Sequence, residues 1–306
     1  MTAQSVILPL PSDHARFIVL RLKDLSIEEL KEKFEDLIST RDRLISQHPQ
    51  ADIKTAIAFG PELWDKLYSK RPEGFNQLAP IHGSFEMPVV SADVIIHIAA
   101  QRADLCFALS QSFFDGIQDK VEVLDERVCF RQFDGRDLTG FIDGTENPQF
   151  PDDRAETALL PEDADEFADG SFIFAQRYAH NLEKWKKLKV DAQEQVIGRT
   201  KLESIELDDD VQPNNSHVSR TVVEDGDGEE MAILRHSLPY GDGKGDQGLF
   251  FIAYTNDLSI IDSMLLRMFG TSGDGIHDRL LHFVTPKDGA YYFAPSEALL
   301  ETILES

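Results

Sequence analysis

The chain has 306 residues, of which 42% are hydrophobic, so it is long enough for one large domain or two small packed ones. Its formal net charge of −25 repels phosphate backbones, which makes nucleic acid a poor partner. No run of about eighteen apolar residues predicts a membrane span, and the N-terminal MTAQSVILPLPSDHARF lacks the basic region of a signal peptide, so we expect a cytoplasmic protein.

The first half of the chain alternates predicted strands with predicted helices. Apolar alternation and β-branched runs indicate four strands, at 16–22, 53–59, 94–100 and 121–133. Apolar residues at helical spacing indicate two helices, at 26–39 and 104–114. Ser26 is a good N-cap for the first helix, with Glu29 as its capping-box partner. The order is therefore strand, helix, strand, strand, helix, strand.

The second half repeats this order. We expect strands at 171–178, 231–237, 249–254 and 291–293, and helices at 182–195 and 259–269. DVIIHIAAQRADLCFALSQSF (93–113) and GLFFIAYTNDLSIIDSMLLRMF (248–269) both contain an apolar strand, a polar turn and a helix that ends in Phe. We predict an α+β fold of two duplicated ferredoxin-like βαββαβ units, at 1–150 and 151–306. Each would have an antiparallel sheet and peripheral helices, within one structural unit.

The glycine-rich segments do not match known phosphate or ion loops. GDGKGDQG (241–248) lacks the GK[ST] ending of a phosphate loop, and EDGDGEE (224–230) does not fit the calcium-binding loop pattern. We expect both to form turns. No HExxH or paired CxxC supports a zinc site. Two long segments without clear periodicity, 146–169 and 198–220, are the better places to look for function.

Asp143 lies between two glycines in GFIDGTENP (140–148). From this stretch alone, the carboxylate could cap a helix, close a turn, bind a metal or transfer protons. Gly140 and Gly144 can let the backbone bend sharply around it.

The nine histidines differ in their surroundings. Four lie next to turn or polar residues and are expected to face solvent: His14, His48, His82 and His180. His97 lies within the apolar VIIHIAA, where a core histidine is favoured over a ligand. His236 alternates with Arg235 and Ser237, so it should face the opposite side of that strand. His217, in PNNSHVSR, stands out because it lies among small polar residues in an irregular segment.

Three motifs in order, on a duplicated chain, resemble those of the dye-decolourising peroxidases. GFIDG (140–144) matches the GxxDG motif of this family, NSHVSR (215–220) is similar to the segment with the proximal haem histidine, and LRHSLPYG (234–241) is similar to the strand with the distal arginine. The similarity runs from about Arg16 to Pro295. The chain resembles the shorter bacterial cytoplasmic subgroup. Some members carry a C-terminal tail that docks them into a protein nanocompartment, but the ending ALLETILES does not resemble that tail.

The resemblance implies one haem b per chain, bound between the sheet and the helices of the C-terminal half. His217 would be the proximal ligand of the iron. The acid beside it would be Asp278, with Asp274 as the fallback, unless Asp278 serves only as a charge at a helix N-terminus. Arg199 would pair with a haem propionate or be an ordinary surface arginine. Leu249 and Phe251 would line the distal pocket, which is also compatible with core packing.

The resemblance also implies roles on the distal side. Asp143 would carry a proton between the two oxygens of hydrogen peroxide, and an unperturbed pKa near 4 predicts activity at low pH. Arg235 would stabilise the charge that develops as the O–O bond breaks. Ser237, two residues further on, should point to the same side and could hydrogen-bond peroxide or a distal water.

The function implied is a haem peroxidase that reduces hydrogen peroxide through a ferryl intermediate and oxidises dyes, phenolics or similar small donors. Trp64, Trp185 and the tyrosines are candidate electron relays, and a homo-oligomer, as in relatives, is expected. Two other hypotheses stay open. One is a haem-handling protein that releases haem iron and has incidental peroxidase activity. The other is a duplicated scaffold that binds a different ligand.

Overall fold

The computed structural model describes residues 2–306, which form an α+β fold. The strands are β1 (His14–Leu22), β2 (Lys54–Phe59), β3 (Ile81–His82), β4 (Glu86–Met87), β5 (Val94–Ala100), β6 (Val121–Phe130), β7 (Ser171–His180), β8 (Leu234–Arg235), β9 (Leu238–Gly241), β10 (Gln247–Thr255) and β11 (Val284–Ala294). The α-helices are α1 (Ile27–Gln47), α2 (Pro61–Leu67), α3 (Ala103–Phe114), α4 (Pro151–Ala158), α5 (Leu182–Trp185), α6 (Val190–Ile197), α7 (His217–Thr221), α8 (Leu258–Met268) and α9 (Glu297–Glu305). Short 3₁₀ turns lie at Gln118–Lys120, Glu162–Phe167 and Arg279–His282.

The main sheet is antiparallel and closes on itself. Its hydrogen-bonded order is β7-β11-β2-β5-β1-β6-β9-β10-β8, and β7 also pairs with β10. Eight strands therefore form a barrel, and β8 continues the pairing of β10 beyond β9. The two predicted sheets are thus one sheet, whose halves meet through single residue pairs at β11–β2 and β6–β9.

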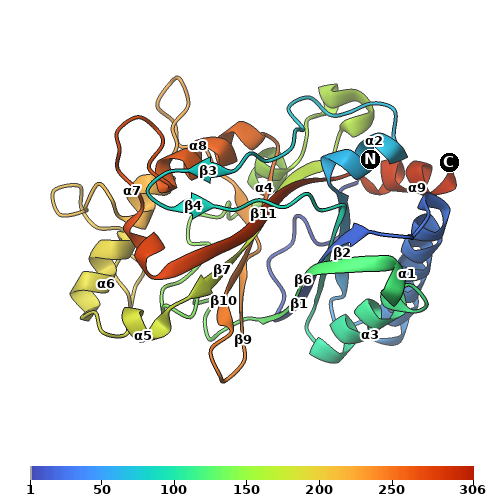
Figure 1. Cartoon of the computed structure of the whole chain (residues 1–306), viewed down its shortest axis with the longest axis horizontal. Coiled ribbons are helices and arrows are strands. Elements are labelled where there is room, and N and C mark those ends of the chain that lie inside the picture. Colours follow the sequence, from blue (N-terminus) through green and yellow to red (C-terminus); the bar gives the residue numbers. More distant parts are fainter. Residues whose placement is uncertain (1) are drawn as a thin grey trace.

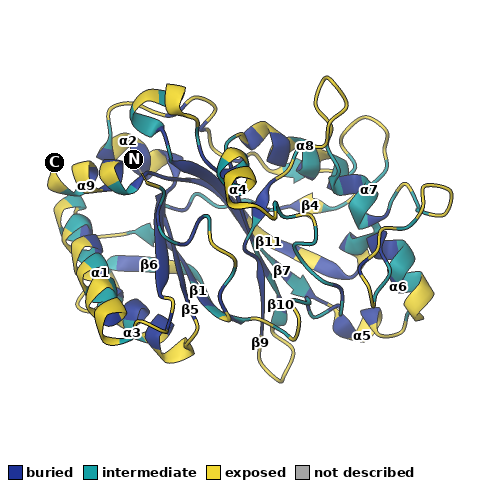
Figure 2. Cartoon of the chain, turned by 180° about the vertical axis from the view of Figure 1, so that it is seen from behind, coloured by how far each residue is buried: buried dark blue, intermediate teal, exposed yellow. Residues whose placement is uncertain are grey.

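The barrel interior is a packed core. Strand side chains alternate between the two faces of a sheet, and a closed sheet turns one face inward. The inward side chains of the eight barrel strands form one hydrophobic cluster, in which Phe17 and Phe250 stack with ring centroids 4.3 Å apart. The helices cover the outer face. α1, α3 and α9 lie at one end of the molecule and α5, α6 and α7 at the other (Figure 1). The strands are mostly buried and the outer sides of the helices exposed (Figure 2).

Helix α1 begins as its sequence predicts. The Ser26 hydroxyl accepts a hydrogen bond from the Glu29 N–H, and the Glu29 carboxylate accepts one from the Ser26 N–H, so the capping box is present. The helix continues to Gln47, eight residues past the predicted end at 39 (47 − 39 = 8). Buried Leu44 extends the apolar stripe through these additional turns.

Several predicted elements differ from the observed ones. The strand expected at 231–237 is interrupted, because β8 ends at Arg235 and β9 begins at Leu238. The helix expected at 182–195 is split into α5 and α6, and α6 starts only at Val190. The irregular segments contain short helices, α4 in 146–169 and α7 in 198–220. Within residues 2–306, no helix combines the length and hydrophobicity that crossing a bilayer requires.

Candidate active site

One large cavity lies on the outer face of the barrel in the C-terminal half. Its volume is about 320 Å³, and Asp143, His217 and Arg235 all line it. Strands β7 and β10 form its floor, and helices α7 and α8 form the opposite wall. The three sequence motifs, separated by up to 101 residues (241 − 140 = 101), therefore meet at one place between sheet and helices.

His217 is held in a fixed orientation. It is the first residue of α7, whose N-cap Ser216 accepts a hydrogen bond from the Ser219 N–H. The Nδ1 atom of His217 lies 2.6 Å from Oδ2 of Asp278. Because the carboxylate accepts a hydrogen bond from Nδ1–H, Nε2 keeps its lone pair and can bind a metal.

Asp278 serves both roles considered for it. Its side chain is fully buried, one oxygen faces His217, and the other accepts a hydrogen bond from the Leu280 N–H at the start of a 3₁₀ turn. Asp274 instead pairs with Arg220 at 2.8 Å and does not line the cavity. Of the two carboxylates considered, the structure therefore brings Asp278 to His217.

Asn147 joins the aspartate motif to the arginine strand. Its Oδ1 accepts a hydrogen bond from the Arg235 N–H at 3.0 Å, and its Nδ2 donates to the Arg235 carbonyl at 2.8 Å. These two bonds place the Arg235 guanidinium beside Asp143, with Nη1 3.7 Å from Oδ1. Asn147 lies in the TENP extension of the motif, and residue patterns gave no indication of this bridging role.

Burial changes the acid–base properties of Asp143. The loss of hydration is the largest effect and raises its pKa above the ordinary value, while Arg235 lowers it and Asp137 raises it further. The prediction of an unperturbed pKa is therefore wrong. The Asp143 side chain is 22% exposed. Because Asp143 lines the cavity, its carboxylate can be reached from this site.

Gly140 and Gly144 both adopt left-handed backbone conformations, with φ of 91° and 77°. A Cβ atom at Gly144 would lie 3.0 Å from Nδ2 of Asn147 and would press on the amide that holds Arg235. The predicted sharp bend is thus present. The absence of a side chain at Gly144 also leaves room for the Asn147 amide that bonds to Arg235 of β8.

The residues after Arg235 are oriented differently from a regular strand. His236 faces the barrel interior, as predicted, with its ring centroid 5.4 Å from that of Tyr254. Ser237 does not line the cavity, and its hydroxyl accepts a hydrogen bond from the Ile252 N–H at 3.3 Å. The break between β8 and β9 interrupts the alternation on which the predicted orientation of Ser237 depends.

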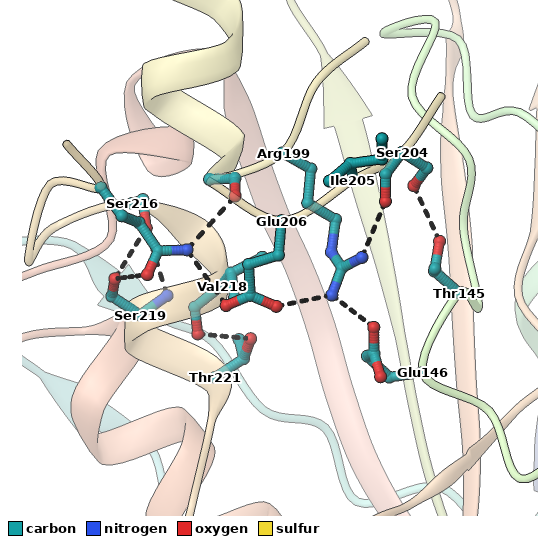
Figure 3. Close-up of polar contacts among 12 residues, drawn as sticks. Thr145, Glu146, Arg199, Ser204, Ile205, Glu206, Ser216, Val218, Ser219 and Thr221 are labelled. Atoms are coloured by element: carbon teal, nitrogen blue, oxygen red, sulfur yellow. Dashed lines mark hydrogen bonds and ion pairs between the residues drawn. The ribbon is translucent and has the colours of Figure 1, made fainter. Parts of the chain in front are cut away.

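Arg199 is a buried residue at the cavity, which excludes the hypothesis of an ordinary surface arginine. It is 8% exposed and lines the cavity. Its guanidinium pairs with Glu146 and Glu206 and donates to the Ser204 carbonyl (Figure 3). Two carboxylates thus already hold this cation near the place where a carboxylate-bearing ligand could bind.

The walls of the cavity are mainly apolar. Leu249 and Phe251 project into it from β10, as predicted, and alternate with Phe250 and Ile252, which point into the barrel. Further apolar lining comes from α7, α8 and the segment around the 3₁₀ turn, including Val218, Met264, Leu265, Met268 and Leu281.

The polar lining of the cavity also includes His180 and Asp137. His180 was expected to face solvent, but its side chain is only 4% exposed, because β7 carries it under the C-terminal helical layer. Its Nδ1 lies 3.6 Å from Oδ2 of Asp137. Within residues 2–306, neither that nitrogen nor Oδ1 of Asp137 has a hydrogen-bond partner. Asp137 lies six residues before Asp143 (143 − 137 = 6), and its proximity to the motif was the only signal available.

The two tryptophans lie at different distances from this site. The Trp185 indole N–H donates to the carbonyl of Thr139, and Thr139 itself lines the cavity. Trp64 belongs to the core cluster of the outer helical layer, and its indole N–H donates to the Lys70 carbonyl. Their roles as electron relays stay predictions.

The residues around the cavity fit haem. No three metal-ligating side chains converge anywhere in the described chain, so a site built from protein ligands alone has no support. A porphyrin supplies four of the iron's ligands and needs one axial nitrogen, which His217 offers. Apolar walls suit the flat macrocycle, and Arg199 suits a carboxylate at its edge.

Comparisons with known proteins match dye-decolourising peroxidases over nearly the whole chain. The family models for DyP-type peroxidases match residues 4–131 (N-terminal) and 134–299 (C-terminal). A dye-decolorizing peroxidase of Mycolicibacterium paratuberculosis is 36% identical, covering 97% of this chain and 84% of its own. The structure of a dye-decolorizing protein from V. cholerae is similar with a TM-score of 0.93 and 37% identity, covering 98% of this chain and 99% of that one.

Two further proteins bear on the cofactor and on the alternative hypothesis. A DypB variant from Rhodococcus jostii RHA1, whose structure is in complex with heme, has a TM-score of 0.89 and 35% identity, with 98% of each chain covered. The deferrochelatase of Escherichia coli is more distant, at 21% identity over 79% of this chain and 65% of its own. The chain therefore belongs to the dye-decolourising peroxidase family and is a haem peroxidase.

Proposed function

We propose that one haem b binds per chain in this cavity, with Nε2 of His217 as the axial ligand of the iron. The observation that carries this proposal is the hydrogen bond of 2.6 Å between His217 and Asp278. A buried carboxylate that accepts a hydrogen bond from Nδ1–H makes Nε2 of the imidazole a stronger metal ligand and fixes the ring orientation. When bound, haem supplies the iron at which peroxide is reduced.

On the distal side, Asp143 and Arg235 act on hydrogen peroxide. Asp143 takes the proton from one peroxide oxygen and returns it to the other, which leaves as water. Arg235 is permanently cationic and stabilises the negative charge that develops on the oxygens during this transfer. Ser237 does not line the cavity, and its hydroxyl oxygen accepts a hydrogen bond from the Ile252 N–H, so we assign it a smaller role than these two residues.

Arg199 anchors the edge of the cofactor. A haem propionate would share the guanidinium with Glu146 and Glu206 or displace one of them, and Glu146 is the more exposed of the two (63% against 45%). Figure 3 shows how both carboxylates converge on the same nitrogen. The donors oxidised are phenolics, dyes or similar small molecules, and we propose that the protein works in the cytoplasm as a homo-oligomer.

The same fold suggests how the site arose. The N-terminal strands are ordered β2-β5-β1-β6, and the later ones run β11, β7 and β10, followed by the interrupted strand β8–β9. We number the main-sheet strands by their order within each half, which leaves out β3 and β4. The first run read from β6 and the second read from β11 then both give 4-1-3-2, the order of a ferredoxin-like unit. We therefore propose a duplication of ferredoxin-like halves, of which only the second binds haem.

Stopped-flow mixing of the haem-loaded protein with hydrogen peroxide tests the distal roles. Wild type should show a rapid change of the haem absorption spectrum, and Asp143→Ala and Arg235→Leu should slow it strongly. Asp274→Ala is the matched control, because it removes a carboxylate that does not line the cavity. Equal rates in all four proteins would refute the distal assignment and favour a haem-handling protein, as the distant deferrochelatase relative suggests.

A further inference from the structure

The barrel interior contains a polar cluster that the proposed function does not use. The hydroxyl of Tyr254, on β10, lies 2.8 Å from Nδ1 of His97, on β5. His236, on the connection between β8 and β9, lies 5.4 Å from the Tyr254 ring and 6.1 Å from the His97 ring, measured between centroids. All three side chains are buried, within the inward-facing apolar cluster.

The resting protonation of the Tyr254–His97 pair follows from its surroundings. Burial lowers the pKa of His97 well below the ordinary value, and the neighbouring His236 and Lys54 lower it further, so His97 is neutral. Burial raises the pKa of Tyr254, so the phenol keeps its proton. The phenol therefore donates to Nδ1, and the imidazole proton is on Nε2.

This environment distinguishes Tyr254 from the other five tyrosines. Tyr240 accepts a hydrogen bond from Arg177, and Tyr291 donates to the carboxylate of Asp262. Tyr292 is buried in the same interior as Tyr254 but has no imidazole at its hydroxyl, and the same holds for Tyr68 and Tyr178 across residues 2–306. Tyr254 is thus the one described tyrosine whose proton can pass to a neutral imidazole.

Tyr254 also lies close to the haem cavity, on the other side of one sheet. Three residues before it on β10, Phe251 projects into the cavity, a distance of about 10 Å along the strand. Ala253, its direct neighbour, pairs with Arg235 of the distal site. A single strand therefore connects the cavity to the buried pair.

We propose that Tyr254 and His97 form a redox pair that supplies an electron to the peroxidase site, an inference that rests on the proposed function. Reduction of hydrogen peroxide to two waters takes up two electrons and two protons. One electron leaves the Tyr254 phenol through β10, and the phenol proton moves along the 2.8 Å bond to Nδ1 of His97. The products are a neutral tyrosyl radical and a His97 imidazolium, and an electron from a donor later restores the phenol as the proton returns.

The pair holds an oxidising equivalent on two side chains that are buried away from the molecular surface. The interior is packed with apolar side chains, and the proton stays within the pair because His97 takes it up. In the absence of a donor in the cavity, the oxidising equivalent thus stays inside the barrel as the Tyr254 radical, away from exposed residues.

Freeze-quench electron paramagnetic resonance tests this inference. The haem-loaded protein is mixed with hydrogen peroxide without a donor, in unlabelled form and with ring-deuterated tyrosine. We expect a tyrosyl signal that narrows on deuteration, is lost in Tyr254→Phe and is kept in Tyr292→Phe, the matched buried control. The inference is overturned if wild type gives no tyrosyl signal although its absorption spectrum responds to peroxide, or if the signal survives in Tyr254→Phe.

The proton acceptor is tested with His97→Gln, whose amide oxygen can accept the hydrogen bond but cannot take up the proton. The radical signal should fall sharply in this variant, and an unchanged signal would exclude His97 as the acceptor. Nitrogen-15 NMR of the haem-free protein provides a readout that is independent of peroxide, because Tyr254→Phe should shift the His97 Nδ1 resonance. If wild type does not react with peroxide at all, the proposed function fails, which is distinct from a reaction without a Tyr254 radical.

Discussion

The two halves of the molecule cover the outer face of the barrel in different ways. In the N-terminal half, two long helices, α1 with 21 residues and α3 with 12, pack densely, and Phe34 and Phe113 stack with ring centroids 5.7 Å apart. In the C-terminal half, the helical layer consists of shorter pieces, α6 with 8 residues, α7 with 5 and α8 with 11. These pieces leave the cavity of about 320 Å³ between themselves and the sheet.

This difference shows how one half of a regular fold becomes a site. A long amphipathic helix buries a continuous apolar stripe and fills the space above a sheet. Short helices cannot do so, and their additional termini bring two buried capping residues, Ser216 and Asp278, to this region. Asp278 caps a 3₁₀ turn and contacts His217, which is itself the first residue of α7. The interrupted layer thus provides both the space and the polar groups.

Removing the proposed axial nitrogen should eliminate the functional difference between the halves. We expect His217→Ala to lose haem binding, because no other cavity-lining side chain among residues 2–306 is an imidazole with a carboxylate on Nδ1 at hydrogen-bond distance. Titration of the haem-free protein with haem, followed by its absorption, measures this. His282→Ala, which removes a histidine outside the cavity lining, is the control and should bind haem like wild type.

Neutralising the distal acid should lower activity and raise stability. Asp143→Asn removes the proposed proton carrier, for which a loss of about 10²–10⁴-fold in the peroxide reaction is expected. The proposed proton transfer requires the deprotonated form of Asp143 in wild type, so the rate should fall as pH drops through the raised pKa, above the range of an ordinary aspartate.

The stability effect of Asp143→Asn has a defined sign. The folded pKa is raised, so between the ordinary and the raised value the folded state binds more protons, and wild-type stability decreases as pH rises. The melting temperatures of Asp143→Asn and wild type should therefore converge at low pH and differ in favour of the variant above the raised pKa. A variant that is less stable than wild type at neutral pH would contradict this explanation.

Truncating one phenylalanine in each half compares the densely packed helical layer of the N-terminal half with the cavity-containing layer of the C-terminal half. Phe34→Ala should lower the free energy of unfolding by about 3–5 kcal/mol, since Phe34 is 1% exposed and surrounded by core residues. Phe251→Ala should lower it less, because one side of Phe251 already faces the cavity. Urea unfolding of the haem-free proteins measures both. Equal losses would show that the cavity is closed in solution.

Asp278→Asn should give the smallest of these effects. The amide oxygen can still accept a hydrogen bond from Nδ1–H of His217, but this bond is weaker than one to a carboxylate. The haem affinity should therefore fall by about 10–100-fold. Asp274→Asn is the matched control and should leave the affinity unchanged, because Asp274 pairs with Arg220. A similar loss in both variants would mean that Asp278 acts only through the fold.

Local patterns predicted the elements and motifs that depend on neighbours in the chain. The capping box at Ser26 and the outward orientation of Leu249 and Phe251 follow from spacings of two to four residues. Orientation was predicted wrongly where a distant segment covers a residue. His180 looked solvent-facing from its polar neighbours, but the C-terminal helical layer covers it.

The sequence by itself determined the types of element, the three motifs and the histidine that stands out among nine, because each of these is encoded within a few residues. Only the tertiary structure decided which carboxylate meets His217, that Asn147 ties Asp143 to Arg235, and that burial raises the pKa of Asp143. It also brought His97 and Tyr254 together, which are 157 residues apart. Hydration and through-space contacts are properties of the packed barrel, and no stretch of the chain contains them alone.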